Sequence, residues 1–312
     1  MNDTTVELSI VIVNWNASDV LDGCLESIGA NASCPHEIIV VDNASSDDSC
    51  EMVKARHPGV RLIANDMNMG FAAANNQGIR IATGRYVLLL NPDTLIVDTV
   101  LDDMIAIADE HTECGVVGCQ VRETPEVIQQ TCFRFPTPGR LFLREFGLAR
   151  LCPSLFGGDI IAGWDRCSER DVDVISGMFM LVRSDRIAEI GLLDERFFIY
   201  TEEADWCYRF HKAGYACRFF PGSWILHLDG GSKSTRQVKP KMYVQKQKSQ
   251  LQFMAKHHGR AGWFMAWAIL LISMIFRVLI HAIPALFHQP SVYRLDRSIK
   301  SLRFLLSNQI PA

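Results

Sequence analysis

Several motifs that identify common classes of α/β protein are missing from this chain of 312 residues. It contains no G-x-G-x-x-G after the first predicted strand and no G-x-x-x-x-G-K-[ST], which argues against Rossmann-type nicotinamide or flavin enzymes and P-loop nucleotide hydrolases. The ten cysteines include no C-x-x-C pair, so zinc ribbons and thioredoxin-like redox sites are not expected. An N-terminus with Asp3 and Glu7, without a basic and apolar leader, predicts a cytoplasmic protein with reduced thiols.

Acidic residues are also absent from one long stretch, residues 230–295. Residues 230–312 carry thirteen basic residues and one acidic residue, a net charge of +12, whereas residues 1–229 carry a net charge of −16. A basic segment on an acidic body predicts an anionic partner for the basic part, either nucleic acid or a membrane surface.

Apolar β-branched runs alternate with helical patterns along the first part of the chain. Strands are predicted over 8–14, 37–41, 60–64, 86–90 and 115–121. Helices are predicted from Ser18, from Ser45 or Ser46, and over 70–82 and 97–109. This alternation predicts an α/β fold with a doubly wound, mostly parallel sheet.

The rest of the chain is less uniform. Proline and glycine predict loops and short helices over 123–170, followed by a regular stretch over 172–183 and a helix around 202–213. We therefore expect a nucleotide-sugar-binding half over 1–122, an acceptor-binding and catalytic half over 123–229, and a helical tail over 230–312.

Short polar side chains follow four of the predicted strands. They are Asn14 and Asn16, Asp42 and Asn43, the segment 65–70, and Asn91-Pro92-Asp93. Ligands of open parallel sheets bind beyond the carboxyl ends of the strands, so these residues predict a binding site, although ordinary turn chemistry uses the same residue types. Without a glycine-rich phosphate loop, a divalent cation held by a carboxylate such as Asp93 could neutralise a diphosphate.

The order and spacing of longer stretches carry a more specific signal. They are SIVIVNWN (9–16), EIIVVDNASSD (37–47), NDMNMGF (65–71) onward to Ile79, GRYVLLLNPDT (84–94), SGMFMLVR (176–183), GLLDERFFIYTEEADWCYRFHKAG (191–214) and HLDGGS (227–232). Over about residues 7–232 the chain resembles the inverting glycosyltransferases of family 2, which have a GT-A fold, and within them the rhamnosyltransferase-like branch that builds bacterial cell-surface polysaccharides.

The resemblance implies a nucleotide-sugar site. Asp42 is expected to bind the nucleobase or ribose with the help of the backbone near Asn14 and Trp15. Asn68, Gly70 and Asn75 are expected to line the diphosphate-ribose side. Asn91-Pro92-Asp93 is similar to the family's D-x-D element, with Asp93 as a ligand of Mg²⁺ or Mn²⁺. His227 resembles the histidine that joins the metal and the diphosphate.

The resemblance also implies a catalytic cluster at the start of the helix around 202–213. An inverting transfer needs one base for the acceptor hydroxyl. Glu203 matches the family's usual aspartate and is the first choice, Glu202 is the second, and Asp205 is expected to position the acceptor or the loop. Tyr200 and Trp206 are candidates for stacking on an acceptor sugar, with core packing as the alternative.

The basic tail contains sixteen uncharged residues, 261–276, fewer than the about 20 needed to span a bilayer. Arg277 follows directly, and Ser273, Arg277 and His281 share one helical face. We expect a peripheral or re-entrant helix on the cytoplasmic face of the inner membrane, bound to anionic lipid through residues 233–303. A spanning helix and an interface between copies of the chain are the alternatives, and the apolar run argues against nucleic acid.

The sequence therefore predicts a metal-dependent hexosyltransferase that moves a sugar, with rhamnose from dTDP-rhamnose as the first choice, to a cell-surface polysaccharide or lipid-linked glycan. The alternatives are a transferase that uses a UDP-sugar and a nucleotide-sugar-binding scaffold that has lost catalysis.

Overall fold

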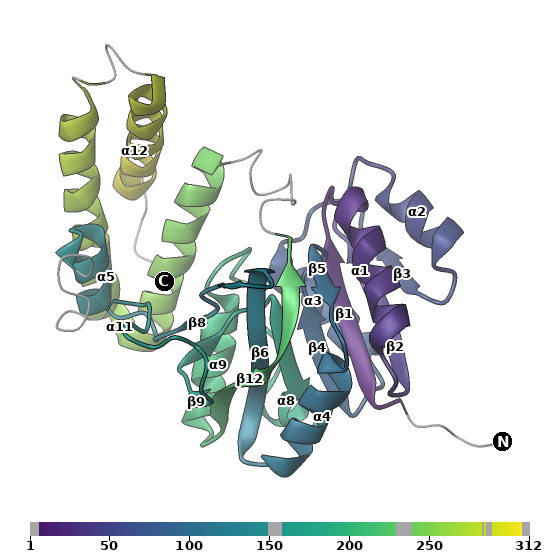
Figure 1. Cartoon of the computed structure of the whole chain (residues 1–312). Helices are drawn as coiled ribbons and strands as arrows, with labels where there is room; N and C mark the ends of the chain where they lie inside the picture. Colours follow the sequence, from purple (N-terminus) through teal and green to yellow (C-terminus); the bar gives the residue numbers. More distant parts are fainter. Residues whose placement is uncertain (1–5, 149–157, 229–238, 283, 285–288, 308–312) are drawn as a thin grey trace. The chain divides into compact units, whose positions relative to one another are not determined.

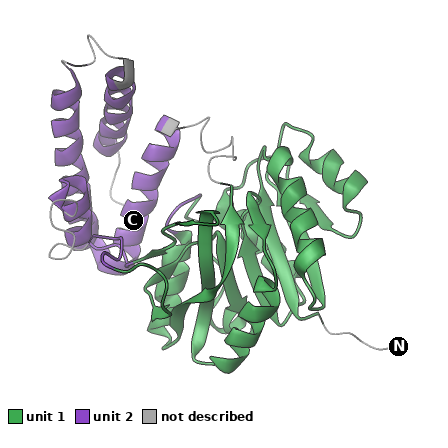
Figure 2. Ribbon diagram, viewed as in Figure 1, with its two compact units in different colours: residues 1–133, 164–198, 202–236 green, residues 134–163, 199–201, 237–312 purple. Residues whose placement is uncertain are grey.

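The computed structural model describes residues 6–148, 158–228, 239–282, 284 and 289–307. These residues form two compact units (Figure 2). Unit 1 comprises residues 1–133, 164–198 and 202–236, and unit 2 comprises residues 134–163, 199–201 and 237–312. The predicted boundary at 229–230 lies outside the described residues.

Unit 1 is built on a mixed β-sheet with the strand order β3-β2-β1-β4-β11-β6-β12-β5 (Figure 1). These strands are β1 (Leu8–Asn14), β2 (His36–Asp42), β3 (Arg61–Ala64), β4 (Tyr86–Leu90), β5 (Thr94–Ile96), β6 (Cys114–Thr124), β11 (Phe179–Arg183) and β12 (Ala216–His227). Short strands β7 (Val127–Ile128) and β9 (Arg170–Asp171) pair with β6 and β12, and β8 (Cys132–Phe133) pairs with β10 (Val174–Ile175).

The α/β fold is confirmed, and the first four strands run parallel as predicted. The sheet is mixed because β11 runs antiparallel to both β4 and β6, and β5 runs antiparallel to β12. A three-residue strand such as β5 is too short to produce a periodic pattern, so the sequence did not predict it.

Helices cover both faces of the sheet. They are α1 (Ser18–Asn31), α2 (Ser49–Arg56), α3 (Phe71–Ile81), α4 (Val100–Glu110), α8 (Ser184–Ile190) and α9 (Glu202–Lys212). Side chains of α1 and α4 form one buried core with Leu8, Ile10 and Ile12 of β1. On the opposite face Gly78 of α3 lies against Val11, because successive strand residues point to opposite sides.

Two predicted helix starts were too early. The helix predicted from Ser45 or Ser46 begins at Ser49, because Ser45 and Ser46 are engaged by Asp42 and Asn16. The helix predicted from residue 97 begins at Val100, because Asp98 has a φ of 50°, outside the helical region.

Unit 2 is helical and contains α5 (Pro138–Glu145), α11 (Lys239–Ala282) and α12 (Gln289–Ser307). At Gly259 a φ of 66° and a ψ of −167° interrupt α11, so residues 239–258 and 260–282 are two separate helical stretches. By length and composition alone, Pro240–Ala282 is apolar enough to cross a membrane, and it is the one such helix among the described residues.

Candidate active site

The carboxyl ends of β1 and β2 meet at a hydrogen-bonded pair, Asn14 and Asp42. Their strands pair in register there, and Asn14 Nδ2 donates to Asp42 Oδ2 at 2.8 Å. The Asp42 carboxylate also accepts from the backbone NH of Ser45 at 2.9 Å and from its hydroxyl at 2.6 Å. Both side chains are buried, and Asn14 Oδ1 has no hydrogen-bond partner among the described residues. Asp42 thus orders the turn after β2, and its predicted contact with a nucleobase stays a prediction. Trp15, which follows Asn14 in the chain, is half-buried.

A second cluster shapes the segment 65–70. Asn43 Nδ2 donates to Gly70 O at 3.1 Å, and Asn43 Oδ1 accepts from Met69 N at 3.0 Å. Asn68 Oδ1 accepts from Gly70 N at 2.9 Å, which closes a tight turn directly before α3. Gly70 has a φ of 86° and a ψ of 168°, a backbone region in which side chains clash. The predicted diphosphate residues Asn68 and Gly70 therefore form one built loop at a helix N-terminus, a position suited to an anion.

Asn75, the third residue predicted on this side, is buried in α3. Its Nδ2 donates to Phe71 O at 2.9 Å within the helix. The next residue, Asn76, spans further: its side chain donates to Leu193 O at 2.8 Å and accepts from Leu193 N at 3.0 Å. Asn76 ties α3 to the segment that leads toward α9, and sequence reasoning did not identify it.

Asp93 and His227 lie together. The antiparallel register of β12 against β5 sets His227 opposite Thr94, and Leu228 N donates to Asp93 O at 2.8 Å. His227 Nε2 lies 3.3 Å from Asp93 Oδ1, and each side chain is 7% exposed. Asp93 Oδ1 and His227 Nδ1 are buried without a hydrogen-bond partner in the described parts of the chain. Asp93 and His227 are 134 positions apart in the chain, yet their side chains lie next to each other.

This pair fits a divalent cation that takes most of its ligands from elsewhere. A carboxylate oxygen and an imidazole nitrogen both bind Mn²⁺, while Mg²⁺ favours the carboxylate. Groups of three or more His, Cys, Asp or Glu that could enclose a metal are absent from the described residues. The protein therefore offers two ligands, and a bound diphosphate could supply others.

The segment before Asp93 is held by the protein interior. Asn91 N donates to Met178 O at 3.2 Å, and Asn91 O accepts from the Thr94 hydroxyl at 2.7 Å. Cys24 packs beside Thr94, and burial, opposed by the hydrogen bond to Thr94, raises the pKa of the Cys24 thiol to about 12. Cys24 therefore stays protonated and acts as a packing residue. All nine cysteines that the structure describes are free.

The acidic cluster lies in the first turn of α9, where the helix dipole favours carboxylates. Glu202 is buried, Glu203 is half-buried, and Asp205 is fully enclosed. Asp205 Oδ2 accepts from Arg209 Nε at 3.0 Å. The same guanidinium donates to Ile190 O at 2.9 Å and to Leu192 O at 2.7 Å. Asp205 thus orients Arg209, which holds the loop 190–192, and this arrangement favours the positioning role expected for Asp205.

Trp206 lies in the core. It is 0% exposed, its Nε1 donates to Gly191 O at 2.8 Å, and its ring packs edge-on against Phe210. This burial favours support of the loop 190–192, and contact with an acceptor sugar stays a prediction. Tyr200 is half-buried, and both Tyr200 and Thr201 have positive φ angles, 69° and 76°. Such angles are rare for these residue types and store strain directly before Glu202.

Comparison with known sequences points to one family. A family model described as Glycosyl transferase family 2 matches residues 9–157. The chain is 26% identical over 287 residues to an N-acetylglucosaminyl-diphospho-decaprenol L-rhamnosyltransferase of Mycobacterium tuberculosis, which covers 83% of this chain and 87% of that protein. It is 29% identical over 209 residues to the low-salt glycan biosynthesis hexosyltransferase Agl10 of Haloferax volcanii, which covers 65% of this chain and 61% of that protein.

Solved structures show the same fold. The mannosyltransferase PcManGT from Pyrobaculum calidifontis, in complex with GDP-Man and Mn²⁺, matches with a TM-score of 0.56 at 15% identity over 96% of this chain and 87% of its own. S. aureus TarS 1–349 matches with a TM-score of 0.50 at 14% identity over 96% of this chain and 90% of its own. At these identities the likeness concerns the fold alone, which is the GT-A type α/β fold expected from the sequence.

Proposed function

Because the chain belongs to glycosyltransferase family 2, we propose that it transfers a sugar from a nucleoside diphosphate donor to a glycan or lipid-linked glycan acceptor with inversion at the anomeric carbon. The observation that carries this proposal is the buried pair Asp93 and His227, which the paired strands β5 and β12 bring together. An orphaned carboxylate oxygen beside an imidazole suits a donor diphosphate that arrives with a cation.

The donor side is supported by the strand-end residues. The turn 68–70 directly precedes α3, so the positive end of the helix dipole lies at the proposed diphosphate side, and Asn14 and Asp42 offer a polar edge to the nucleoside. A bound Mg²⁺ or Mn²⁺ would stabilise negative charge on the leaving diphosphate. Asp93 and His227 would hold that cation.

The acceptor side needs a base. Glu203 accepts the proton of the acceptor hydroxyl. At the same time the hydroxyl oxygen forms a bond to the anomeric carbon of the donor sugar, and the bond from that carbon to the diphosphate breaks. Glu202, deeper in the same turn, is the alternative base. Asp205 and Trp206 keep the loop 190–192 against α9.

The proposed donor is dTDP-rhamnose, and UDP-sugars are the competing donors. The name of the Mycobacterium tuberculosis relative, an L-rhamnosyltransferase, supports the sugar and names no nucleotide. That name also supports an acceptor on a polyprenyl diphosphate. We place the chain at the cytoplasmic face of the inner membrane, as a peripheral or re-entrant protein. The basic tail supports this placement, although residues 233–238, 283 and 285–288 of the proposed membrane-binding region lie outside the described residues.

The test is sugar transfer by the full chain with Mg²⁺ or Mn²⁺, to a polyprenyl-diphosphate N-acetylglucosamine, from dTDP-rhamnose and from a panel of UDP- and GDP-sugars. We expect transfer from dTDP-rhamnose with the opposite anomeric configuration in the product. Donor binding by calorimetry without transfer to this acceptor or to a lipid extract would identify a scaffold protein.

Two substitutions show which of Glu202 and Glu203 is the base. Glu203→Gln is expected to lower kcat by about 10²–10⁴-fold with little change in the donor KM. Glu202→Gln is the competing variant, and the larger loss identifies the base. Glu110→Gln, an exposed glutamate at the end of α4, serves as the matched control. Wild-type activity in a double variant Asp93→Ala/Glu203→Gln would refute the mechanism.

A further inference from the structure

The second helical stretch of α11, residues 260–282, has an exposed apolar face. Six large apolar residues on it are 43–65% exposed: Met265, Ile272, Ile275, Phe276, Leu279 and Ile280. They recur at steps of three, four and seven residues, so they share one side of the helix. Water-exposed apolar side chains in such a continuous stripe indicate a surface that binds another apolar phase.

The opposite side of the same stretch is buried within unit 2. Trp263, Ala266, Leu270 and Met274 belong to a core that also contains Leu251 and Met254 of the first stretch of α11, Leu141 of α5 and Leu305 of α12. Tyr243 OH lies 4.0 Å from Met274 Sδ, so the two stretches of α11 fold back on each other at Gly259. The helix is therefore already packed on one side, and one side remains open.

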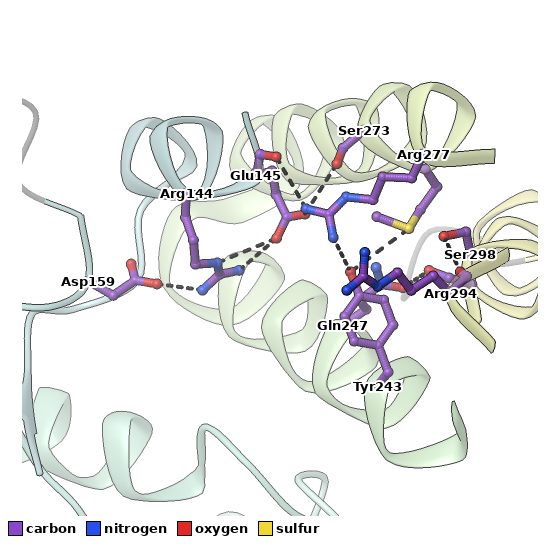
Figure 3. A network of polar contacts seen from close by, with 11 residues as sticks. Arg144, Glu145, Asp159, Tyr243, Gln247, Ser273, Arg277, Arg294 and Ser298 are labelled. Carbon is purple, nitrogen blue, oxygen red and sulfur yellow. Dashed lines mark hydrogen bonds and ion pairs between the residues drawn. The ribbon is translucent and has the colours of Figure 1, made fainter. Parts of the chain in front are cut away.

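The charge that follows the uncharged run is neutralised on the buried side (Figure 3). Arg277 Nη2 donates to Glu145 Oε2 at 2.9 Å, and its other terminal nitrogen donates to Tyr243 OH at 3.2 Å. Ser273 Oγ donates to the same carboxylate oxygen at 3.2 Å. The polar stripe of Ser273 and Arg277 thus faces α5 and leaves the exposed face free of charge.

The apolar surface continues from α11 onto α5. The ring of Phe276 lies 6.5 Å from that of Phe146, which in turn lies 4.8 Å from that of Phe142. Phe142 is 43% exposed. Two helices therefore contribute to one apolar surface, which is larger than a single helix face provides.

Basic residues accompany this surface. Arg260 at the start of the stretch and Arg294 and Arg303 on α12 are exposed, and acidic residues are absent from 230–295. The one acidic residue of 230–312, Asp296 on α12, is paired with Lys300. Apolar area together with a net positive charge complements an anionic lipid surface, and a protein partner would not require this excess of one sign.

We propose that the apolar face of residues 260–282, extended by Phe142, inserts into the headgroup and acyl boundary of an anionic bilayer, with the helix lying along the membrane surface. This proposal refines the membrane location given above and rests on it for its biological sense.

A crossing orientation is disfavoured by the covered side of the helix. Arg277 would have to enter the bilayer with its partner Glu145, and α5 and the lysine-bearing first stretch of α11 would have to follow. An arginine at the centre of a span costs about 2.5–3.5 kcal/mol on insertion scales, before its partners are counted. Only the exposed side can meet lipid without dismantling unit 2.

The test is flotation of the full chain with phosphatidylcholine vesicles, with and without phosphatidylglycerol. We expect binding that requires phosphatidylglycerol, weakens at high salt, and falls at least about tenfold in Ile275→Gln/Leu279→Gln. Val127→Gln, which changes an exposed apolar residue of β7, is the matched control and should bind like the wild type. The thermal unfolding midpoint of each variant shows that it is folded.

Three outcomes would overturn the proposal. The first is unchanged flotation of the double variant. The second is a dimer that the double variant dissociates while vesicle binding persists, which would make the face an interface between two copies. The third is retention in membranes after a carbonate wash, which would indicate a crossing helix. Because flotation does not measure sugar transfer, this proposal and the proposed enzymatic function can fail separately.

Discussion

His227 reaches Asp93 because β12 pairs with β5 in a register that sets His227 opposite Thr94. The imidazole has one nitrogen 3.3 Å from the carboxylate and the other buried without a hydrogen-bond partner in the described residues. A purely structural histidine would be expected to use both nitrogens, since buried polar atoms are normally paired. This arrangement is the reason to expect a third, exogenous group at the pair.

His227→Ala is therefore expected to raise the Mn²⁺ concentration for half-maximal activity by about 10–100-fold. The measurement is a titration of activity with Mn²⁺ at saturating donor. His36→Ala, at the first residue of β2, is the control and should leave the titration unchanged. An unchanged Mn²⁺ requirement in His227→Ala would mean that His227 only packs against Asp93.

Glu37 gives a prediction about pH. Burial alone would raise its pKa, but hydrogen bonds from Ser9, Thr83 and Arg61 together lower the pKa of Glu37 to about 2. Because the pKa is lower in the folded state, this carboxylate stabilises the protein fully above the ordinary pKa of about 4.3. That contribution is lost as the pH falls toward 2.

The expected result concerns the difference in unfolding midpoint between the wild type and Glu37→Gln. The difference should be large at about pH 7 and smaller at about pH 3.5, measured by urea unfolding. Glu51→Gln, which changes an exposed glutamate of α2, is the control and should show a smaller difference than Glu37→Gln at about pH 7. A Glu37→Gln difference that grows on acidification would contradict the assigned hydrogen bonds.

At the level of elements, the junction between the segment 65–70 and α3 depends on Gly70. A Cβ at Gly70 would lie 2.5 Å from Phe198 O, and Phe71 N donates to the same carbonyl at 2.6 Å. The backbone of Gly70, with φ 86° and ψ 168°, is one that only glycine adopts easily.

Gly70→Ala is therefore expected to destabilise the protein by about 1–3 kcal/mol from backbone strain alone, and to weaken donor binding because the loop at the start of α3 must shift. The measurements are urea unfolding and donor calorimetry. Gly29→Ala is a matched control with the opposite sign: Gly29 lies inside α1, and a Cβ at this position would have no other atom within 4 Å, so alanine should stabilise by about 0.5–1 kcal/mol. Equal effects of the two substitutions would refute this account.

The same elements show what the sequence could predict. The strands β1, β2 and β4 were predictable because each is an apolar β-branched run between turn residues, and their parallel pairing follows from the helices between them. The antiparallel orientation of β11 was not predictable, since the apolar sequence of a buried strand is similar in parallel and antiparallel strands. β5 is too short to produce a pattern.

The candidate site likewise contains residues that the sequence predicted and residues that it did not. Asp93 was proposed because a polar residue after a buried strand is a local feature, whereas the acidic cluster in the first turn of α9 was proposed from the resemblance to family 2 glycosyltransferases. Asn76 was missed because its partners in Leu193 lie 117 positions away. Arg209 was missed as well, although Asp205 four residues earlier is a recognisable helical ion pair.

On the scale of the whole molecule, the chain crosses from one unit to the other twice within a few residues. Residues 199–201 belong to unit 2, whereas residues 198 and 202 belong to unit 1. Within unit 2, Ser249 Oγ donates to Ile199 O at 2.8 Å, and Ser249 is 0% exposed. The next two residues hold positive φ angles of 69° and 76°, and α9 begins directly after them. Strained backbone of this kind persists only when surrounding contacts hold it.

Ser249→Ala removes that hydrogen bond from the carbonyl of half-buried Ile199, so we expect a loss of about 0.5–1.5 kcal/mol in the free energy of unfolding. We also expect kcat to fall while the donor KM stays constant, because the proposed donor residues Asn14, Asp42 and Asp93 lie in other segments and the proposed base lies directly after residue 201. The measurements are urea unfolding and steady-state kinetics with the full chain. Ser249→Thr, which keeps the hydroxyl, should recover most of kcat, and Ser298→Ala, which removes a hydroxyl bonded within α12, is the matched control. A kcat in Ser249→Ala equal to that of Ser298→Ala would mean that the helical unit does not influence the start of α9 through residue 199.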